Sequence, residues 1–194
     1  MKTDAIWQAD VQQRVFRHLV ESFSRPGEVQ DLNHCMEADN AQVAVLATLM
    51  DGETTLADPH AQIAAAHWPL LQARQVAIEF ARYITADGQR PPDFQPALGS
   101  LESPEFGATV LIKVYALDQG PLTMQLSGPG IPGQRELRVQ GLHVEWLRQR
   151  ANWVAGFPLG VDIVLCDATR IAALPRTTRI AINGLMTSLT EGDA

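Results

Sequence analysis

The residues best suited to chemistry lie in Pro175-Arg176-Thr177-Thr178, directly after the apolar stretch 171–174. An arginine can bind two oxygens of a phosphate or carboxylate at once, and the two hydroxyls can add hydrogen bonds. Groups at the end of a strand often meet a ligand or a partner. Asp162, which opens the preceding apolar stretch, can instead hold Arg176 in a structural ion pair. We favour a structural or interface role for Arg176, Thr177, Thr178 and Asp162 over ligand binding.

A glycine-rich stretch, Gly128-Pro129-Gly130-Ile131-Pro132-Gly133, invites comparison with a phosphate-binding loop. Such a loop aims backbone N–H groups at the phosphate, usually at the start of a helix and often with a lysine. Here two positions are prolines, which lack an N–H, and no lysine follows. The pattern therefore predicts a tight turn.

The other catalytic residue types form no recognisable centre. No two histidines have helical metal-ligand spacing, and the chain has no Cys-x-x-Cys pair. His60 and His67 lie seven residues apart and can share a helix face, but chance explains this spacing better than a metal site. A Gly-x-Ser-x-Gly nucleophile turn is also missing. We predict no catalytic residue, no metal site and no cofactor.

Composition limits the class of protein. The chain has 194 residues, of which 46% are hydrophobic, and these values predict one globular domain over residues 1–194. Its longest apolar run, residues 43–50, is far shorter than the roughly 20 residues that cross a bilayer. The amino terminus lacks the layout of a secretion signal. We expect a cytoplasmic protein in which Cys35 and Cys166 are buried thiols.

Charge adds a second limit. The net charge of −7 argues against nonspecific nucleic-acid binding, whose affinity comes mainly from neutralising phosphates. Thirteen of the fifteen basic residues are arginines. Arginine suits phosphate recognition and protein interfaces equally, so this bias fits either role.

Apolar periodicity predicts the elements of the first half. Asp4 or Asp10 can cap a helix that ends near Ser24, before Pro26-Gly27. Its apolar face comprises Val11, Val15, Phe16, Leu19, Val20 and Phe23. We predict a buried helix at 41–50, a short helix from Asp58-Pro59 to about residue 67, and a helical turn near Gln95. Strand character marks residues 29–32, 54–57 and 75–84.

The second half favours strands. Residues 109–117 and 122–126 flank Asp118-Gln119-Gly120-Pro121, a hairpin signal. Further strands are predicted at 136–139, 161–166, 171–174 and 179–182, and a helix at 143–151. The tail after Asn183-Gly184 is polar, and we expect it to be loose. The fold class is therefore α/β, with a central mixed β-sheet flanked by helices.

Four blocks of the sequence, in order, resemble the H subunit of the bacterial carbon–phosphorus lyase complex of phosphonate metabolism. They are the segment from Phe16-Arg17 to Ser24-Arg25-Pro26-Gly27, the segment 98–112, the turn Ser127-Gly128-Pro129-Gly130-Ile131 and the segment 157–178. The chain departs from the family pattern at His67-Trp68-Pro69, where a His-Thr-Gly-like step is usual.

The resemblance implies the fold of the pyridoxal-phosphate-dependent transferases. Such enzymes hold their cofactor through a lysine Schiff base. Lys113, the only interior lysine, lies in a predicted strand with no cofactor motif beside it. We expect Lys113 at a sheet edge or in an ion pair, and hence the fold without its cofactor lysine.

The resemblance further implies a non-catalytic subunit of the carbon–phosphorus lyase core complex. Its partners would be the G, I and J subunits, and the isolated chain would form a homodimer. The step supported is formation of ribose 1-methylphosphonate 5-triphosphate from ATP and methylphosphonate. The alternative is a free-standing small-molecule enzyme that depends on pyridoxal phosphate or a nucleotide.

Overall fold

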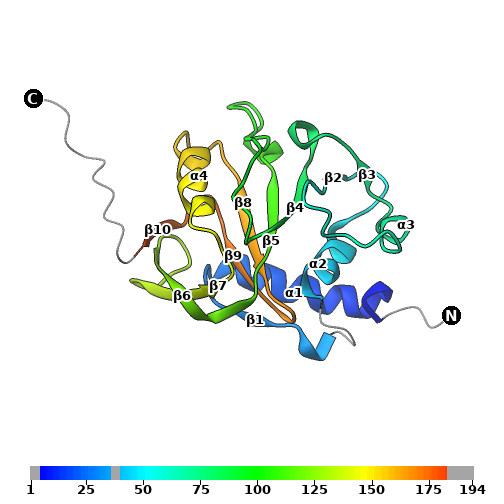
Figure 1. Cartoon of the computed structure of the whole chain (residues 1–194), viewed down its shortest axis with the longest axis horizontal. Coiled ribbons are helices and arrows are strands. Elements are labelled where there is room, and N and C mark those ends of the chain that lie inside the picture. The colour runs from blue at the N-terminus through cyan, green and yellow to red at the C-terminus, as the bar shows by residue number, and fades with distance from the viewer. Residues whose placement is uncertain (1–4, 36–39, 183–194) are drawn as a thin grey trace, which may run out of the picture.

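The protein is described by a computed structural model over residues 5–35 and 40–182 (Figure 1). A seven-stranded mixed sheet forms its centre, in the order β1-β9-β8-β5-β4-β2-β3. The run from β8 to β3 is parallel, whereas β9 and β1 each pair antiparallel with their neighbour. The strand bounds are β1 Gln30–Asp31, β2 Thr55–Ala57, β3 Arg74–Gln75, β4 Tyr83–Asp87, β5 Thr109–Lys113, β8 Asp162–Cys166 and β9 Arg170–Leu174.

A smaller antiparallel sheet, in the order β10-β6-β7, packs on one face of the large sheet. Its strands are β6 Ala116–Ser127, β7 Arg135–Gln140 and β10 Arg179–Ile182. The α-helices are α1 Ala9–Ser24, α2 Ala41–Leu49, α3 Trp68–Leu71 and α4 Glu145–Val154. Short 3-10 helices are η1 Ala5–Trp7, η2 Asn33–Cys35, η3 Ile78–Phe80 and η4 Pro104–Phe106. The predicted α/β class with a mixed sheet and helices is confirmed at this level.

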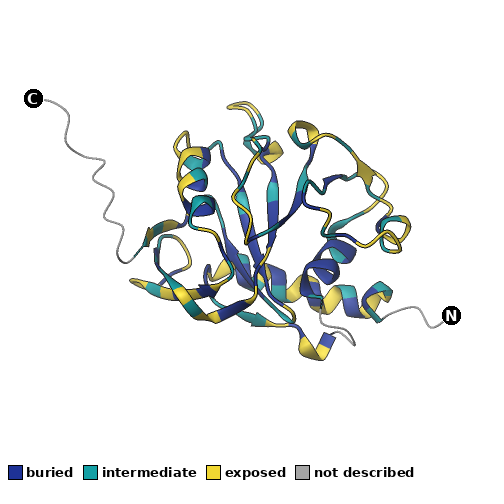
Figure 2. Cartoon of the chain, in the orientation of Figure 1, coloured by how far each residue is buried: buried dark blue, intermediate teal, exposed yellow. Residues whose placement is uncertain are grey.

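Side-chain alternation in the central strands produces two hydrophobic cores. In β5, Val110 and Ile112 belong to the core shared with the small sheet and α4, whereas Leu111 belongs to the core shared with α1 and α2. Successive residues of a strand point to opposite faces, so a continuous apolar run serves both cores. Figure 2 shows the central strands almost entirely buried between these layers.

The two long N-terminal helices form as predicted, with two exceptions in detail. Helix α1 ends at Ser24, and Gly27 follows with a φ of 76°, which glycine adopts without strain. Gln8 occupies the N-cap without a side-chain hydrogen bond, so the predicted aspartate cap is wrong at Asp10; Asp4 lies outside the described residues. Phe16 and Val20 are about half exposed, so the buried stripe is narrower than predicted.

Helix α2 carries apolar residues on every side, which suits its position inside the protein, where residues 41–47 are all buried. Asn40 begins it by accepting a hydrogen bond from the N–H of Val43 at 3.1 Å. Inside the core, Gln42 donates from Nε2 to the carbonyl of Leu111 on β5 at 3.1 Å, which satisfies a buried amide.

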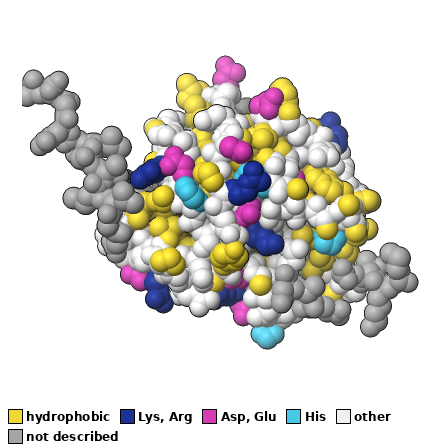
Figure 3. All heavy atoms as spheres, in the orientation of Figure 1, with side chains coloured by type: hydrophobic (Ala, Val, Ile, Leu, Met, Phe, Trp, Pro, Cys, Tyr) yellow, Lys and Arg dark blue, Asp and Glu magenta, His cyan; other side chains and the backbone are white. Residues whose placement is uncertain are grey.

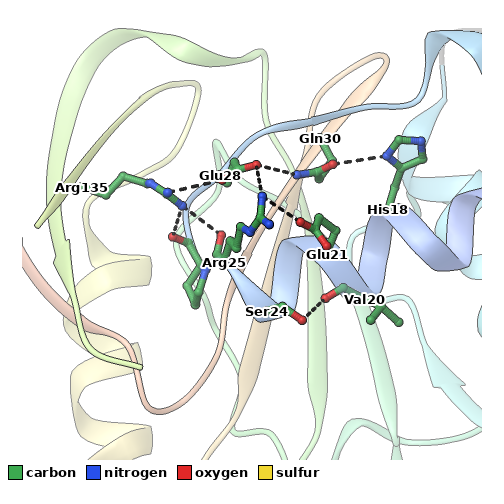
Figure 4. A network of polar contacts seen from close by, with 9 residues as sticks. His18, Val20, Glu21, Ser24, Arg25, Glu28, Gln30 and Arg135 are labelled. Atoms are coloured by element: carbon green, nitrogen blue, oxygen red, sulfur yellow. Dashed lines mark hydrogen bonds and ion pairs between the residues drawn. The ribbon is translucent and has the colours of Figure 1, made fainter. Parts of the chain in front are cut away.

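A polar network joins the end of α1 to the small sheet (Figure 4). Arg135 on β7 donates to the carbonyls of Arg25 and Pro26, each at 3.1 Å, and pairs with Glu28 at 3.3 Å. Arg25 in turn pairs with Glu21 at 2.9 Å. The Pro26-Gly27 turn is thereby tied to a strand more than a hundred residues away in the sequence.

The predicted hairpin at residues 118–121 is wrong. Strand β6 runs through these residues, and its register against Val139 of β7 shifts between Leu117 and Leu122. Asp118 and Gly120 have φ values of 59° and 112°, so the turn-forming residues make an irregularity within one long strand. Consequently β5 and β6 belong to different sheets, and β10 joins the small sheet instead of closing the large one.

The helix predicted from Asp58 to about residue 67 is also wrong, since α3 begins only at Trp68. The Asp58 carboxylate accepts hydrogen bonds from the N–H groups of Gln62 and Ile63, both at 2.8 Å, and Ala61 is left-handed with a φ of 52°. This local turn breaks the helical path. The helical turn predicted near Gln95 is likewise wrong, because the chain there has no regular structure.

Three smaller predictions have clear outcomes. The glycine-rich stretch 128–133 is the turn between β6 and β7, as predicted, with no helix after it. Cys35 and Cys166 are buried free thiols, also as predicted. Lys113 is not at a sheet edge: it ends the central strand β5, is exposed, and has no ion pair among the described residues. The tail from Asn183 lies outside the described residues.

Candidate functional site

Asp162 and Arg176 form a mostly buried ion pair. Asp162 begins β8, and Arg176 lies in the turn that follows the antiparallel strand β9, so sheet pairing brings them together. Asp162 Oδ1 accepts the backbone N–H of Arg176 at 2.7 Å, while Oδ2 accepts from guanidinium Nη2 at 2.8 Å. The Arg176 side chain is only 14% exposed, and that of Asp162 is 20% exposed. The sequence left Arg176 either as a contact for a ligand or partner or as the partner of Asp162 in an ion pair. The structure contains the ion pair.

Backbone carbonyls complete the surroundings of this guanidinium. Arg176 Nη1 donates to the carbonyls of Pro104 at 2.8 Å and Pro158 at 3.3 Å. Gly107 makes the approach possible, because a Cβ there would lie 3.0 Å from both terminal nitrogens of Arg176 and would collide with the carbonyl of Gly160. Arg176 therefore fastens two loops to the end of the sheet.

The two threonines beside Arg176 differ. Thr177 is exposed, whereas Thr178 is buried, and its N–H donates to the carbonyl of Pro175 at 2.9 Å. Among the described residues, the Thr178 hydroxyl has no hydrogen-bond partner. A buried hydroxyl without a partner is uncommon in a folded protein.

Arg150 on α4 is the functional candidate that the sequence analysis missed. It is 3% exposed, and its Nη2 donates to the carbonyls of Pro175 at 2.6 Å and Thr178 at 3.0 Å. Its Nε–H has no acceptor within the described part of the chain. Burial lowers the pKa of Arg150 to about 10, and the negative charge of Asp162 opposes part of that shift.

A signal for Arg150 was present in the sequence. At helical spacing it shares a face with Trp146, Leu147 and Trp153, all of which are buried. A charged residue in the apolar stripe of a helix either pairs inside the fold or serves a ligand. The predicted helix included this position, but its faces were not assigned.

A cavity of about 940 Å³ separates α4 from the segment that ends in β10. Four arginines line it, Arg148, Arg150, Arg176 and Arg179, together with both threonines of the turn. Its apolar lining includes Leu147, Val154, Phe157, Ile180 and Ile182. No described acidic residue is among its lining residues, although Asp162 and Glu145 pair with Arg176 and Arg148.

The two loops that Arg176 holds carry large exposed apolar side chains. We call Leu101, Phe106 and Phe157 the apolar rim; they are 64–77% exposed. They lie on the two loops that Arg176 fastens through Pro104 and Pro158. Large exposed apolar groups gathered at one place are typical of a protein interface. On the face that Figure 3 displays, charges of both signs are scattered among hydrophobic side chains, without an extended basic patch.

We next consider a metal site, a role for His60 and a membrane span within residues 5–35 and 40–182. No group of three or more His, Cys, Asp or Glu side chains there has a metal-binding arrangement. His60 is buried, and its Nδ1 accepts the N–H of Asp87 at 3.0 Å, so this ring supports a loop. The helices described are all too short or too polar to span a membrane.

Comparison with known proteins gives the family. The sequence model of the bacterial phosphonate metabolism protein (PhnH) family matches residues 4–181. The chain belongs to the PhnH family. The match includes Asp162, Arg150 and the turn that carries Arg176, so the site described above lies within the family domain.

Two relatives span nearly the whole chain. HtxG of Stutzerimonas stutzeri, named as a proposed C-P lyase subunit, is 43% identical over 179 residues, covering 92% of this chain and 90% of the relative. The subunit PhnH of alpha-D-ribose 1-methylphosphonate 5-triphosphate synthase from Rhizobium meliloti (strain 1021) is 31% identical over 196 residues, covering 91% and 92%. The resemblance inferred from the four sequence blocks is confirmed.

Proposed function

We propose that the chain is a non-catalytic subunit of a carbon–phosphorus lyase core complex in organophosphonate catabolism. The observation that carries this proposal is the nearly full-length similarity to two relatives, one named as a proposed C-P lyase subunit and the other as a subunit of alpha-D-ribose 1-methylphosphonate 5-triphosphate synthase. By analogy with the second relative, the step supported is formation of ribose 1-methylphosphonate 5-triphosphate from ATP and methylphosphonate. The 194 residues would act as one cytoplasmic domain, with the fold of the pyridoxal-phosphate-dependent transferases but without their cofactor.

The proposed partners are the G, I and J subunits of the complex, and a second copy of the chain when it is alone. The apolar rim supports an interface, because burying its three large side chains against a partner would remove their apolar area from water. Arg176 fits this role as a support: it holds the two rim loops in place from behind.

Reconstitution tests the assignment directly. Adenine release from ATP plus methylphosphonate is measured with the G, I, J and L components, with and without this chain. We expect no release from the chain alone and a clear dependence of the complete mixture on it. Turnover by the isolated chain, with pyridoxal phosphate or without it, would favour the free-standing enzyme instead.

Substitution of the rim tests the interface. Phe106→Ser together with Phe157→Ser should weaken co-purification with the partner subunits while the melting temperature stays close to that of the wild type, because both side chains are exposed. Leu70→Ser, an exposed apolar residue on α3, is the matched control and should assemble normally. Equal assembly of all three proteins would place the interface elsewhere.

Light scattering of the isolated chain tests the homodimer. The expected mass is twice the chain mass of 21.2 kDa. A mass of one chain that persists at high concentration would contradict self-association.

A further inference from the structure

Strand β10 has one edge without a neighbouring strand in the described part of the chain. In the order β10-β6-β7, β10 pairs only with β6. Among the described residues, no backbone hydrogen bond other than those to β6 involves residues 179–182. Proteins protect such edges with charges, prolines or a covering segment. Here Arg179 supplies one charge, and the three residues that follow it are apolar.

The cavity beside α4 borders this free edge (Figure 1). All four residues of β10 line it. Because successive side chains of a strand point to opposite faces, a space that meets all four residues meets the edge of the strand. Helix α4 contributes Leu147, Ala151 and Val154 to the same cavity. A groove between a helix and a free strand edge is suited to an extended segment that adds one more strand.

The direction of the backbone groups limits which residues such a strand can meet. The carbonyl of Thr178 accepts a hydrogen bond from Nη2 of Arg150 at 3.0 Å, so it points toward α4. Backbone groups along an extended chain alternate in direction with a period of two residues. We therefore infer that Ile180 and Ile182 direct their N–H and C=O groups to the α4 side, away from β6.

The sequence directly after β10 is a hairpin signal. Ile182 is followed by Asn183-Gly184, the pair that best suits a two-residue type I′ turn, in which both residues have positive φ. A two-residue turn at this place pairs Ile182 with residue 185 and Ile180 with residue 187, each through hydrogen bonds. These are the residues of β10 whose backbone groups are free. Turn chemistry and backbone direction thus select the same register independently.

The side-chain pattern fits this register. Residues 185 and 187 would share the face of Ile180 and Ile182, which packs against the hydrophobic core. Residues 186 and 188 would share the exposed face of Arg179 and Ala181. Position 185 is a leucine, which suits the apolar side of the groove, and position 188 is a serine, which suits solvent.

We propose that residues 185–188 form a hairpin with β10 and cover its edge as a fourth strand of the small sheet. The occupant of the groove beside α4 is then this chain's own segment, and a partner's strand can bind there only after displacing it. Residues 183–194 lie outside the described residues, and their polar composition alone predicted a loose tail. The inference concerns the isolated chain and is independent of the proposed function.

Disulfide trapping in the full chain tests the register. Positions 181 and 186 would be a non-hydrogen-bonded cross-strand pair with Cα atoms about 4.5 Å apart, which a disulfide can join. Ala181→Cys with Met186→Cys has four thiols, because Cys35 and Cys166 are buried and free. We expect mild oxidation to leave two of the four, counted in denaturant.

The matched control for trapping is Ala181→Cys with Thr187→Cys. In the proposed hairpin these two side chains point to opposite faces, so all four thiols should remain. Equal oxidation of the two variants is the result expected of an unpaired segment and would overturn the proposal. So would four remaining thiols in the first variant.

Hydrogen exchange of the backbone amides tests the turn. In the wild type we expect the N–H groups of Ile180 and Ile182 to be protected. Gly184→Val should lower that protection by about tenfold or more, because valine resists the positive φ of the turn. Gly192→Val, beyond the proposed strand, is the control and should exchange as the wild type does. The amide of Ala181, directed to β6, is the internal reference.

Two exchange results would overturn the proposal. One is equal exchange at Ile180 and Ile182 in the wild type and in Gly184→Val. The other is protection that rises with protein concentration, since that would assign the edge of β10 to a second copy of the chain.

Discussion

Two arginines, Arg150 and Arg176, line the same cavity but differ in their partners. Arg176 has a carboxylate, Asp162, at 2.8 Å and two further carbonyl acceptors. Arg150 is more deeply buried, and its hydrogen-bond acceptors are backbone carbonyls only. Its Nε–H has no acceptor among the described residues. Removing the carboxylate partner of a buried cation leaves an uncompensated charge, whereas a buried cation without a carboxylate has no such partner to lose. The ion pair with Asp162 that the sequence analysis considered for Arg176 is present, whereas the buried Arg150 was not singled out from the sequence.

The largest loss of stability is expected when the carboxylate of Asp162 is removed. Asp162→Ala leaves the Arg176 guanidinium and the N–H of Arg176 without their acceptor, in a site that is mostly closed to water. We expect the free energy of unfolding to fall by about 3 kcal/mol, measured by urea denaturation. Asp10→Ala, which removes the exposed pair with Arg14, is the control and should change it by less than about 0.5 kcal/mol. Equal effects would show that the Asp162 pair is worth no more than a surface contact.

A smaller loss is expected for Arg176→Lys. The charge is kept, but one ammonium group cannot reach Asp162 and both proline carbonyls at the same time. Unfolding free energy should fall by about 2 kcal/mol. Assembly with partner subunits should decline only as far as folding does. A variant with wild-type stability and lost assembly would make Arg176 a direct contact residue.

Arg150→Met should cost less than either change at Arg176. It removes two hydrogen bonds to carbonyls, but it also removes a buried charge with no described carboxylate partner, and the two effects partly cancel. We expect a decrease of about 1 kcal/mol in the free energy of unfolding, measured by urea denaturation. A stability loss as large as that of Asp162→Ala would show that Arg150 is mainly structural.

The smallest effect concerns pH. Burial lowers the pKa of Arg150 from its ordinary value to about 10, so the unfolded chain holds this proton more tightly than the folded one. Between these two pKa values the folded protein gains stability as pH rises, because it has already released the proton. The stability of the wild type relative to Arg150→Met should therefore increase from about pH 9 to about pH 11. A constant difference across that range would indicate that Arg150 keeps its ordinary pKa in the fold.

Local signals in the sequence were sufficient for several elements. The end of α1 follows from the Pro26-Gly27 stop after a one-sided apolar stripe, and α2 follows from an apolar run too long for a buried strand. The glycine-rich turn at 128–133 was recognised because its prolines lack N–H groups. Family membership also came from sequence, since four separated blocks in the right order are rarely shared by chance.

Tertiary structure decided what local signals could not. Residues 118–121 have turn chemistry, yet β7 pairs with the chain on both sides of them and makes one strand with an irregularity. Whether Arg176 meets Asp162 or a ligand depends on the pairing of β8 with β9, which brings together residues fourteen positions apart. The cavity beside Arg150 exists only because α4 packs near a strand of the second sheet. Long-range pairing of this kind is encoded by the whole chain, so no single segment reveals it.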